Sequence, residues 1–115
     1  MATQGIEIAQ QENDGVVTLS LKGYMDMNSS PEVREALTRY FDKQSKAIIV
    51  DLSEVPYIDS SGIATLVEGL QWSHNSKNKF RLVGLTPTVK DIFEIARLLQ
   101  VFEVFNTKDE ALQGI

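Results

Sequence analysis

The sequence predicts an α/β fold in which a mostly parallel sheet of four to five strands, with an antiparallel N-terminal strand, packs against about four helices. Short β-forming runs alternate with segments of helical apolar periodicity, which is typical of parallel strands joined by right-handed crossovers. The first two runs are joined by Asn13-Asp14-Gly15, a tight-turn signal that makes the first strand antiparallel to the second. Residues 47–50 are apolar throughout, as expected for a strand that is buried on both faces.

The N-terminal half is expected to form a hairpin, a helix and the buried strand. Residues 6–10 alternate weakly, and residues 16–22 alternate strongly and are rich in β-forming side chains. A helix follows, with Ser30 as its expected N-cap and Pro31 at its first position, where a missing N–H costs little. Its apolar stripe extends to about residue 43 and comprises Val33, Leu37, Tyr40 and Phe41.

The C-terminal half continues the alternation of helices and strands. A second helix is predicted to start at Ser60, with the apolar stripe Ile63, Leu66, Val67 and Leu70. Residues 80–83 form a short strand, and the Thr-Pro pair at 86–87 starts a third helix. The stripe of that helix is Val89, Ile92, Phe93 and Ala96. Residues 101–105 are predicted to form the last strand and residues 107–112 a terminal helix.

Composition limits the classes of function open to the chain. Its 115 residues are expected to form a single domain, residues 1–115, whose core needs no disulfide or metal. The absence of cysteine and the single histidine, His74, exclude thiolate chemistry and a multi-histidine metal site. A net charge of −5 argues against nucleic acid as a partner and suits a basic patch on another protein. We therefore expect a binding protein that uses no cofactor.

Hydropathy predicts a cytoplasmic protein. No apolar run approaches the roughly 20 residues that a membrane span requires. Residues 1–5 lack the basic segment followed by an apolar stretch that begins a signal peptide. Neither insertion into a membrane nor export is therefore expected.

Residues 59–62, Asp-Ser-Ser-Gly, are the candidate functional site. Asp59 is suited to cap the second helix by accepting a hydrogen bond from the N–H of Ser61 or Gly62. Ser60 then occupies the first helical position with its hydroxyl toward solvent, and Gly62 is expected to leave the approach to that hydroxyl uncrowded. A helix N-terminus tolerates an added phosphate, because its free N–H groups and the helix dipole favour negative charge. The tetrapeptide is also an ordinary helix cap, so the surrounding sequence must decide between the two interpretations.

Three blocks in order along the chain support the phosphate interpretation. Residues 21–26 are Leu-Lys-Gly-Tyr-Met-Asp. Residues 50–53, Val-Asp-Leu-Ser, lead to residues 58–62, Ile-Asp-Ser-Ser-Gly. The third block begins at residues 82–85, Leu-Val-Gly-Leu, and continues with Val89, Ile92, Phe93, Leu98 and residues 101–105. Together the blocks resemble the STAS domain of anti-sigma factor antagonists from about residue 6 to 112, and the middle block is the most specific.

The resemblance implies a STAS (SpoIIAA-like) fold and a non-enzymatic part in bacterial transcription regulation by partner switching. Such a domain binds a GHKL-type anti-sigma factor that is also a serine kinase, and thereby frees a sigma factor. The kinase phosphorylates the serine after the aspartate, here Ser60, the complex dissociates, and a PP2C-type phosphatase resets the protein. Ser61 is the second candidate for phosphorylation. The expected partner-binding residues are Asp26, Asp59, Ser60, Ser61 and Gly62.

Two other functions remain open at this stage. The same fold serves as an accessory subunit of a membrane complex, such as a lipid-transport ABC ATPase, in which Ser60 or Ser61 is a docking hydroxyl and is not phosphorylated. A co-purifying ATPase subunit in place of a kinase would distinguish that function. An enzyme on a flavodoxin-like scaffold is the other alternative, and no nucleophile–base pair or metal constellation supports it.

Asp51 ends the buried strand, as the phospho-acceptor of a response-regulator receiver does. A receiver also needs an acidic pair after its first strand and a lysine after a late strand, and this sequence has neither at those places. Asp51 is therefore expected to be structural and to order the loop through Ser53.

Overall fold

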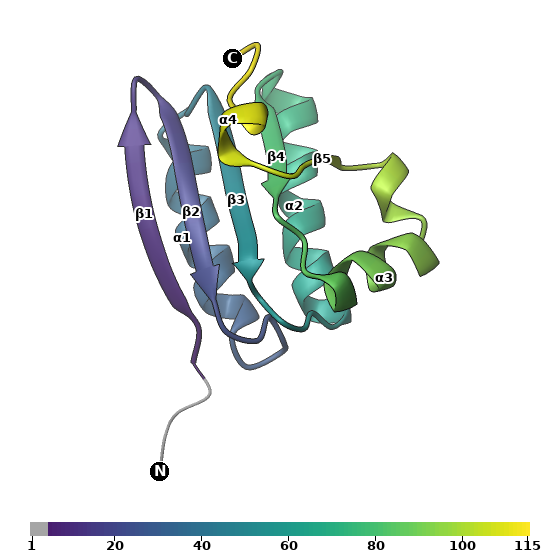
Figure 1. Ribbon diagram of the computed structural model, residues 1–115. Coiled ribbons are helices and arrows are strands. Elements are labelled where there is room, and N and C mark those ends of the chain that lie inside the picture. The colour runs from purple at the N-terminus through teal and green to yellow at the C-terminus, as the bar shows by residue number, and fades with distance from the viewer. Residues whose placement is uncertain (1–4) are drawn as a thin grey trace.

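A five-stranded sheet with the strand order β1-β2-β3-β4-β5 forms the centre of the fold. The computed structural model describes residues 5–115. The strands are β1 (Glu7–Asn13), β2 (Val16–Lys22), β3 (Ala47–Glu54), β4 (Lys79–Val83) and β5 (Glu103–Phe105). β1 pairs antiparallel with β2, and every other pair is parallel, which confirms the predicted topology (Figure 1).

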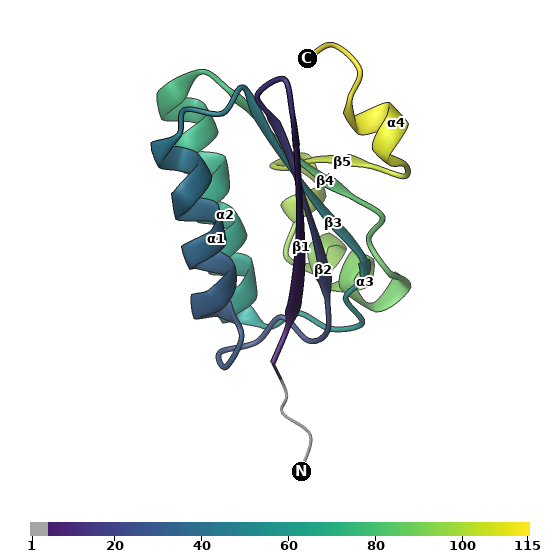
Figure 2. The same cartoon turned by 90° about the vertical axis from the view of Figure 1, so that its left-hand side faces the viewer.

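The helices lie on both sides of this sheet. They are α1 (Ser30–Asp42), α2 (Ser60–Ser76), α3 (Pro87–Ile95) and α4 (Lys108–Ala111), with a 3₁₀ turn η1 (Leu98–Gln100) after α3. α1 and α2 lie side by side on one face, and α4 lies on the opposite face (Figure 2). α3 lies beside the edge formed by β4 and β5 (Figure 1). None of the helices in residues 5–115 combines the length and hydropathy that a membrane crossing needs.

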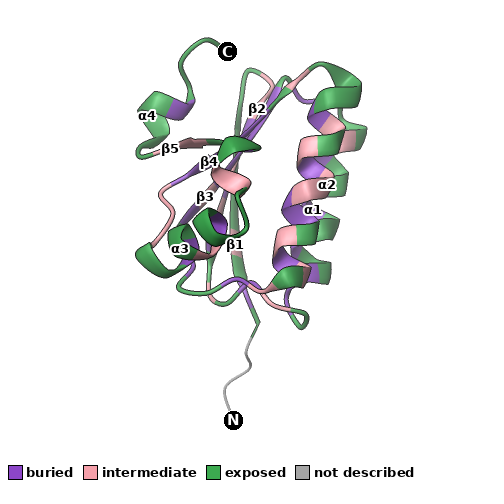
Figure 3. Cartoon of the chain, turned by 90° about the vertical axis from the view of Figure 1, so that its right-hand side faces the viewer, coloured by how far each residue is buried: buried purple, intermediate pink, exposed green. Residues whose placement is uncertain are grey.

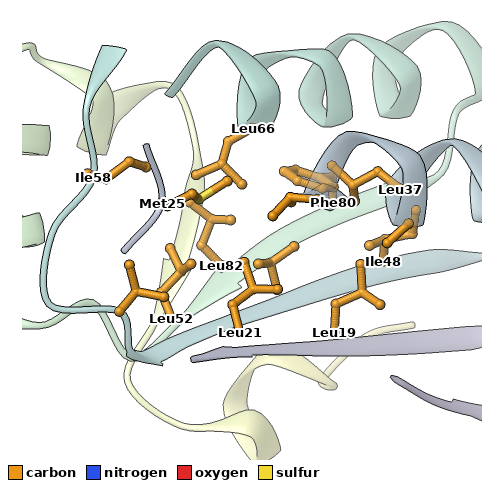
Figure 4. Close-up of a cluster of buried hydrophobic side chains, with 14 of the residues drawn as sticks. Leu19, Leu21, Met25, Leu37, Ile48, Leu52, Ile58, Leu66, Phe80 and Leu82 are labelled. Atoms are coloured by element: carbon orange, nitrogen blue, oxygen red, sulfur yellow. The ribbon is translucent and has the colours of Figure 1, made fainter. Parts of the chain in front are cut away.

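The main core fills the space between the sheet and α1 and α2. Side chains at alternate positions of the three central strands point into it, and the inward faces of both helices are buried (Figure 3). Figure 4 shows part of this core and labels Leu19, Leu21, Met25, Leu37, Ile48, Leu52, Ile58, Leu66, Phe80 and Leu82. Burial of each such side chain stabilises the fold by roughly 1.5–3 kcal/mol, so this face fixes the register of the strands.

A smaller apolar cluster on the opposite face explains why residues 47–50 are apolar throughout. Ile49 and Val83 pack there against Ala111 of α4. The buried guanidinium of Arg81 holds this end of the chain, because its Nη1 donates to the carbonyl oxygens of Ala111 (2.9 Å) and Gln113 (2.6 Å). α4 therefore covers part of the second face of β3 and β4.

Asp51 has the structural position that the sequence predicted. Its Oδ1 accepts a hydrogen bond from the N–H of Ser53 at 2.9 Å. Its Oδ2 also lies 3.5 Å from Nζ of Lys108, which links β3 to α4. That ion pair was not apparent from the sequence, because its partners are far apart along the chain.

Several boundaries differ from the sequence prediction. β1 covers Glu7–Asn13 where residues 6–10 were expected, and β5 starts at Glu103 and not at residue 101, because residues 101–102 form the turn after η1. α1 begins at Ser30 itself and its N-cap is Ser29, so the expected cap at Ser30 was wrong by one residue. α3 ends at Ile95, and Arg97 adopts a left-handed conformation with φ of 60° that turns the chain into η1. Ala96 is consequently exposed and outside the apolar stripe.

Candidate functional site

The candidate site lies where two loops follow neighbouring parallel strands. Residues 23–29 connect β2 to α1, and residues 55–59 connect β3 to α2. The Met25 N–H donates to the Tyr57 carbonyl oxygen (3.0 Å), and the Asp59 N–H donates to the Met25 carbonyl oxygen (3.1 Å). We call residues 23–29 and 55–59 the paired loops. Parallel strands bring their carboxyl ends to one edge of a sheet, the usual place for a site in α/β folds.

Asp59 caps α2 as the sequence predicted. Its Oδ1 accepts hydrogen bonds from the N–H groups of Ser61 (2.9 Å) and Gly62 (3.1 Å). The same oxygen accepts from the Ser61 hydroxyl at 2.6 Å. Its Oδ2 accepts from the N–H of Met27 in the other loop at 3.2 Å. One carboxylate therefore holds both the start of α2 and the loop before α1.

These hydrogen bonds hold the pKa of Asp59 below its ordinary value. The largest cause is the Ser61 hydroxyl, followed by partial burial, which acts in the opposite direction. The N–H groups of Gly62, Ser61 and Met27 lower the pKa further. The carboxylate is thus ionised at neutral pH and adds negative charge beside Ser60.

Acid should destabilise the protein in part through Asp59. Because the pKa of Asp59 is depressed in the folded state, its contribution is present above the unfolded-state pKa of about 3.9 and is lost as the pH falls through the folded value. We expect the free energy of unfolding to fall more steeply below about pH 4 in the wild type than in Asp59→Asn, whose amide oxygen still caps the helix. Urea unfolding at each pH measures both slopes. Equal slopes would contradict the expectation.

The two serines occupy different environments. Ser60 is the first residue of α2 and is exposed, and among the described residues its hydroxyl has no hydrogen-bond partner. Ser61 is half-buried, its hydroxyl is held by Asp59, and it lies 3.3 Å from the hydroxyl of Ser30. Of the two side chains, Ser60 is therefore the more accessible from solvent.

Asp26 lies at the turn before α1 and organises that turn. Its Oδ1 accepts from the N–H groups of Asn28 (2.9 Å) and Ser29 (3.2 Å). Its carbonyl oxygen accepts from both the N–H (2.8 Å) and the hydroxyl (2.7 Å) of Ser30. The first turn of α1 is therefore stabilised by Asp26 in place of a side-chain cap from Ser29.

The structural role of Gly62 differs from the one expected. It is buried, so it does not keep the approach to Ser60 open. A Cβ at this position would lie 2.6 Å from the carbonyl oxygen of Met25 and 2.7 Å from Cγ1 of Ile58. The glycine instead allows α2 to approach the backbone of the paired loops closely.

Three exposed side chains of the paired loops escaped the sequence analysis. Tyr24, Met27 and Tyr57 are 53%, 73% and 43% exposed. The rings of Tyr24 and Tyr57 lie 6.1 Å apart between centroids, at an interplanar angle of 53°. Their one signal in the sequence is that Tyr24 and Tyr57 directly precede the buried residues Met25 and Ile58.

No group of three or more His, Asp or Glu side chains in residues 5–115 is arranged to hold a metal ion.

Known proteins resemble this chain over nearly its whole length. An anti-sigma-B factor antagonist of Listeria monocytogenes is 30% identical over 105 residues, which is 91% of each chain. An anti-sigma-F factor antagonist of Mycobacterium tuberculosis is 25% identical over 114 residues, 99% of this chain and 93% of the relative.

Solved structures show the same fold. An anti-sigma factor antagonist from Mycobacterium paratuberculosis superposes with a TM-score of 0.86 at 24% identity, covering 99% of this chain and 97% of that one. The phosphorylated form of the Bacillus cell fate determinant SpoIIAA superposes with a TM-score of 0.74 at 18% identity, covering 92% and 96%. Residues 7–111 also match the STAS domain as a family. The chain belongs to the STAS domain family.

Proposed function

We propose that this protein is an anti-sigma factor antagonist of the bacterial cytoplasm that binds a GHKL-type serine kinase and is released by phosphorylation of Ser60. The observation that carries the proposal is the exposed Ser60 hydroxyl at the first position of α2, next to the helix cap Asp59. The names of the Listeria and Mycobacterium relatives support the antagonist function. The phosphorylated SpoIIAA structure supports modification within this fold.

The environment of the two serines favours Ser60 over Ser61 as the acceptor. Transfer from ATP forms a bond between the γ-phosphorus and the serine Oγ, breaks the bond to ADP and releases the hydroxyl proton. The Ser60 Oγ is accessible for this reaction. At Ser61 the reaction would first have to break the 2.6 Å hydrogen bond to Asp59 and expose a half-buried side chain.

A phosphate on Ser60 would act at the protein surface and leave the fold intact. It adds about −1.5 to −2 charge at neutral pH, which the N-terminus of α2 tolerates. Asp59 already places negative charge beside it, so a partner that closes over this surface would have to remove two neighbouring charged groups from water. A PP2C-type phosphatase that removes the group would restore binding.

Phosphorylation by kinases of the protein's own host tests this proposal. Wild type, Ser60→Ala and Ser61→Ala would each be incubated with ATP and host extract, and then measured by intact-mass and tandem mass spectrometry. We expect one phosphoryl group on the wild type and on Ser61→Ala, and none on Ser60→Ala. An unmodified wild type in an extract of proven kinase activity would favour the docking-subunit function over the switch. A phosphoryl group that is lost only in Ser61→Ala would identify Ser61, and not Ser60, as the acceptor.

A further inference from the structure

We infer that Tyr24, Met27 and Tyr57 form the apolar anchor of the partner interface, and that the kinase receives them in an apolar pocket with a basic rim. This inference rests on the proposed function and identifies which side chains supply its affinity. We call these three residues the aromatic patch. They are three of the large apolar side chains that the described fold leaves exposed.

The backbone of the paired loops fixes the direction of both tyrosines. Met25 and Ile58 pair in a parallel β-bridge, and both side chains are buried in the main core. Side chains alternate along an extended chain, so Tyr24 and Tyr57 point out of the core. Their ring centroids lie 6.1 Å apart, so the two rings form one exposed aromatic pair. A rigid, exposed aromatic pair loses little entropy on binding, which is why tyrosine is frequent at binding hot spots.

Met27 connects the tyrosines to the phosphorylation site. Its N–H donates to Oδ2 of Asp59, the residue directly before Ser60. Its backbone therefore lies next to the start of α2, and its side chain is 73% exposed. Methionine adapts its shape to a partner surface, so it complements the rigid tyrosines. The loops that carry the aromatic patch are thus bonded directly to the residue before Ser60 at the carboxyl edge of the sheet.

The acidic side chains at this edge of the sheet indicate which charged groups surround the pocket of the partner. A third loop, residues 84–86, joins the edge where the Thr86 hydroxyl donates to the Val55 carbonyl oxygen at 2.8 Å. Residues 23–29, 55–59 and 84–86 contain no lysine or arginine. Their only acidic side chains are Asp26 and Asp59. A partner that covers the apolar side chains must also face these carboxylates, and basic groups around its pocket satisfy both requirements.

In this arrangement the side chains that supply binding affinity differ from the residue whose phosphorylation regulates binding. The apolar side chains would supply binding energy that does not depend on the state of Ser60. A phosphate beside them would have to be desolvated when the partner closes over the aromatic patch, at a cost that ends binding. Phosphorylation would then end binding without any change in the fold.

Affinity measurements with matched alanine variants test the inference. Each GHKL-type serine kinase of the host would be purified singly and titrated by calorimetry with wild type, Tyr24→Ala, Met27→Ala and Tyr57→Ala. Ile95→Ala is the control, because Ile95 is 84% exposed and lies on α3, away from the paired loops. We expect each tyrosine variant to weaken binding about 10-fold or more, and the control by less than about twofold. Thermal unfolding of every variant shows whether the fold is retained.

The dependence of kinase affinity on salt distinguishes the apolar contribution to the interface from the charged one. Wild-type affinity should fall when NaCl is raised from about 50 mM to about 500 mM, because the carboxylates face a basic rim. The tyrosine variants should keep the same dependence on salt, since their carboxylates remain. Loss of the salt dependence in these variants would contradict the separation of anchor and rim.

The outcomes distinguish this inference from the proposed function. A kinase that binds wild type and the folded tyrosine variants equally would overturn the inference alone. A wild-type dimer that dissociates in Tyr24→Ala, with unchanged kinase affinity, would assign the aromatic patch to a second copy of this chain and also overturn it. If no kinase of the panel binds the wild type, the proposed function itself fails and the inference fails with it.

Discussion

Replacement of Gly62 by alanine is expected to destabilise the protein by about 1–3 kcal/mol and to displace the paired loops. The added Cβ would overlap the carbonyl oxygen of Met25 at 2.6 Å. That oxygen cannot move freely, because it accepts the N–H of Asp59 at 3.1 Å and belongs to a residue whose side chain is buried. Alanine is a better helix former than glycine, but that gain of at most about 1 kcal/mol does not offset the overlap.

Gly69→Ala is a matched control for this prediction. Its Cβ would lie 2.3 Å from the ring of buried Phe80, so it should cost a similar free energy of unfolding. Gly69 lies in α2 away from the paired loops, so the amide chemical shifts of residues 24–29 should change in Gly62→Ala and stay near wild type in Gly69→Ala. Urea unfolding and two-dimensional NMR measure both effects. A Gly62→Ala variant as stable as wild type would contradict the close approach.

Local sequence signals were sufficient to predict the strand and helix order. The turn at Asn13-Asp14-Gly15 predicted the β1–β2 hairpin, and the apolar run at 47–50 predicted a strand covered on both sides. The cap at Asp59 was also predictable, because an aspartate two residues before the N–H that donates to it is a local feature. In each case the residues that interact are close in sequence or repeat with a fixed period.

Contacts between distant segments could not be predicted in this way. The role of Gly62 depends on Met25, which precedes it by 37 positions, and nothing in the sequence around either residue indicates their close approach. The bond from the Met27 N–H to Asp59 and the contact of Tyr24 with Tyr57 arise from the same pairing of loops. From the sequence, Gly62 was expected to leave the approach to Ser60 open. In the fold, its missing side chain instead allows α2 to pack closely against the backbone of the paired loops. The cap of α1 moved by one residue because the carbonyl oxygen of Asp26, outside the helix, accepts both the N–H and the hydroxyl of Ser30.

Ser60→Glu is expected to weaken kinase binding by about 100-fold, which corresponds to about 2.7 kcal/mol, and to leave the fold as stable as wild type. A carboxylate at this position imitates part of the phosphate charge beside Asp59. In the first turn of α2 the same charge interacts favourably with the helix dipole, by about 0.3–1 kcal/mol. The free energy of unfolding should therefore stay level or rise while affinity falls.

Ser60→Gln is the matched control, because it has nearly the same size and no charge. If the cost of desolvating the added charge ends binding, Ser60→Gln should bind more tightly than Ser60→Glu. If bulk alone ends binding, both variants should weaken it equally at every salt concentration. Calorimetric titration of the purified kinase with each variant, together with urea unfolding, separates these outcomes. Equal affinity of Ser60→Glu and wild type would contradict a switch at Ser60, and a fall in both affinity and stability would show that the added charge acts on the fold and not on the surface.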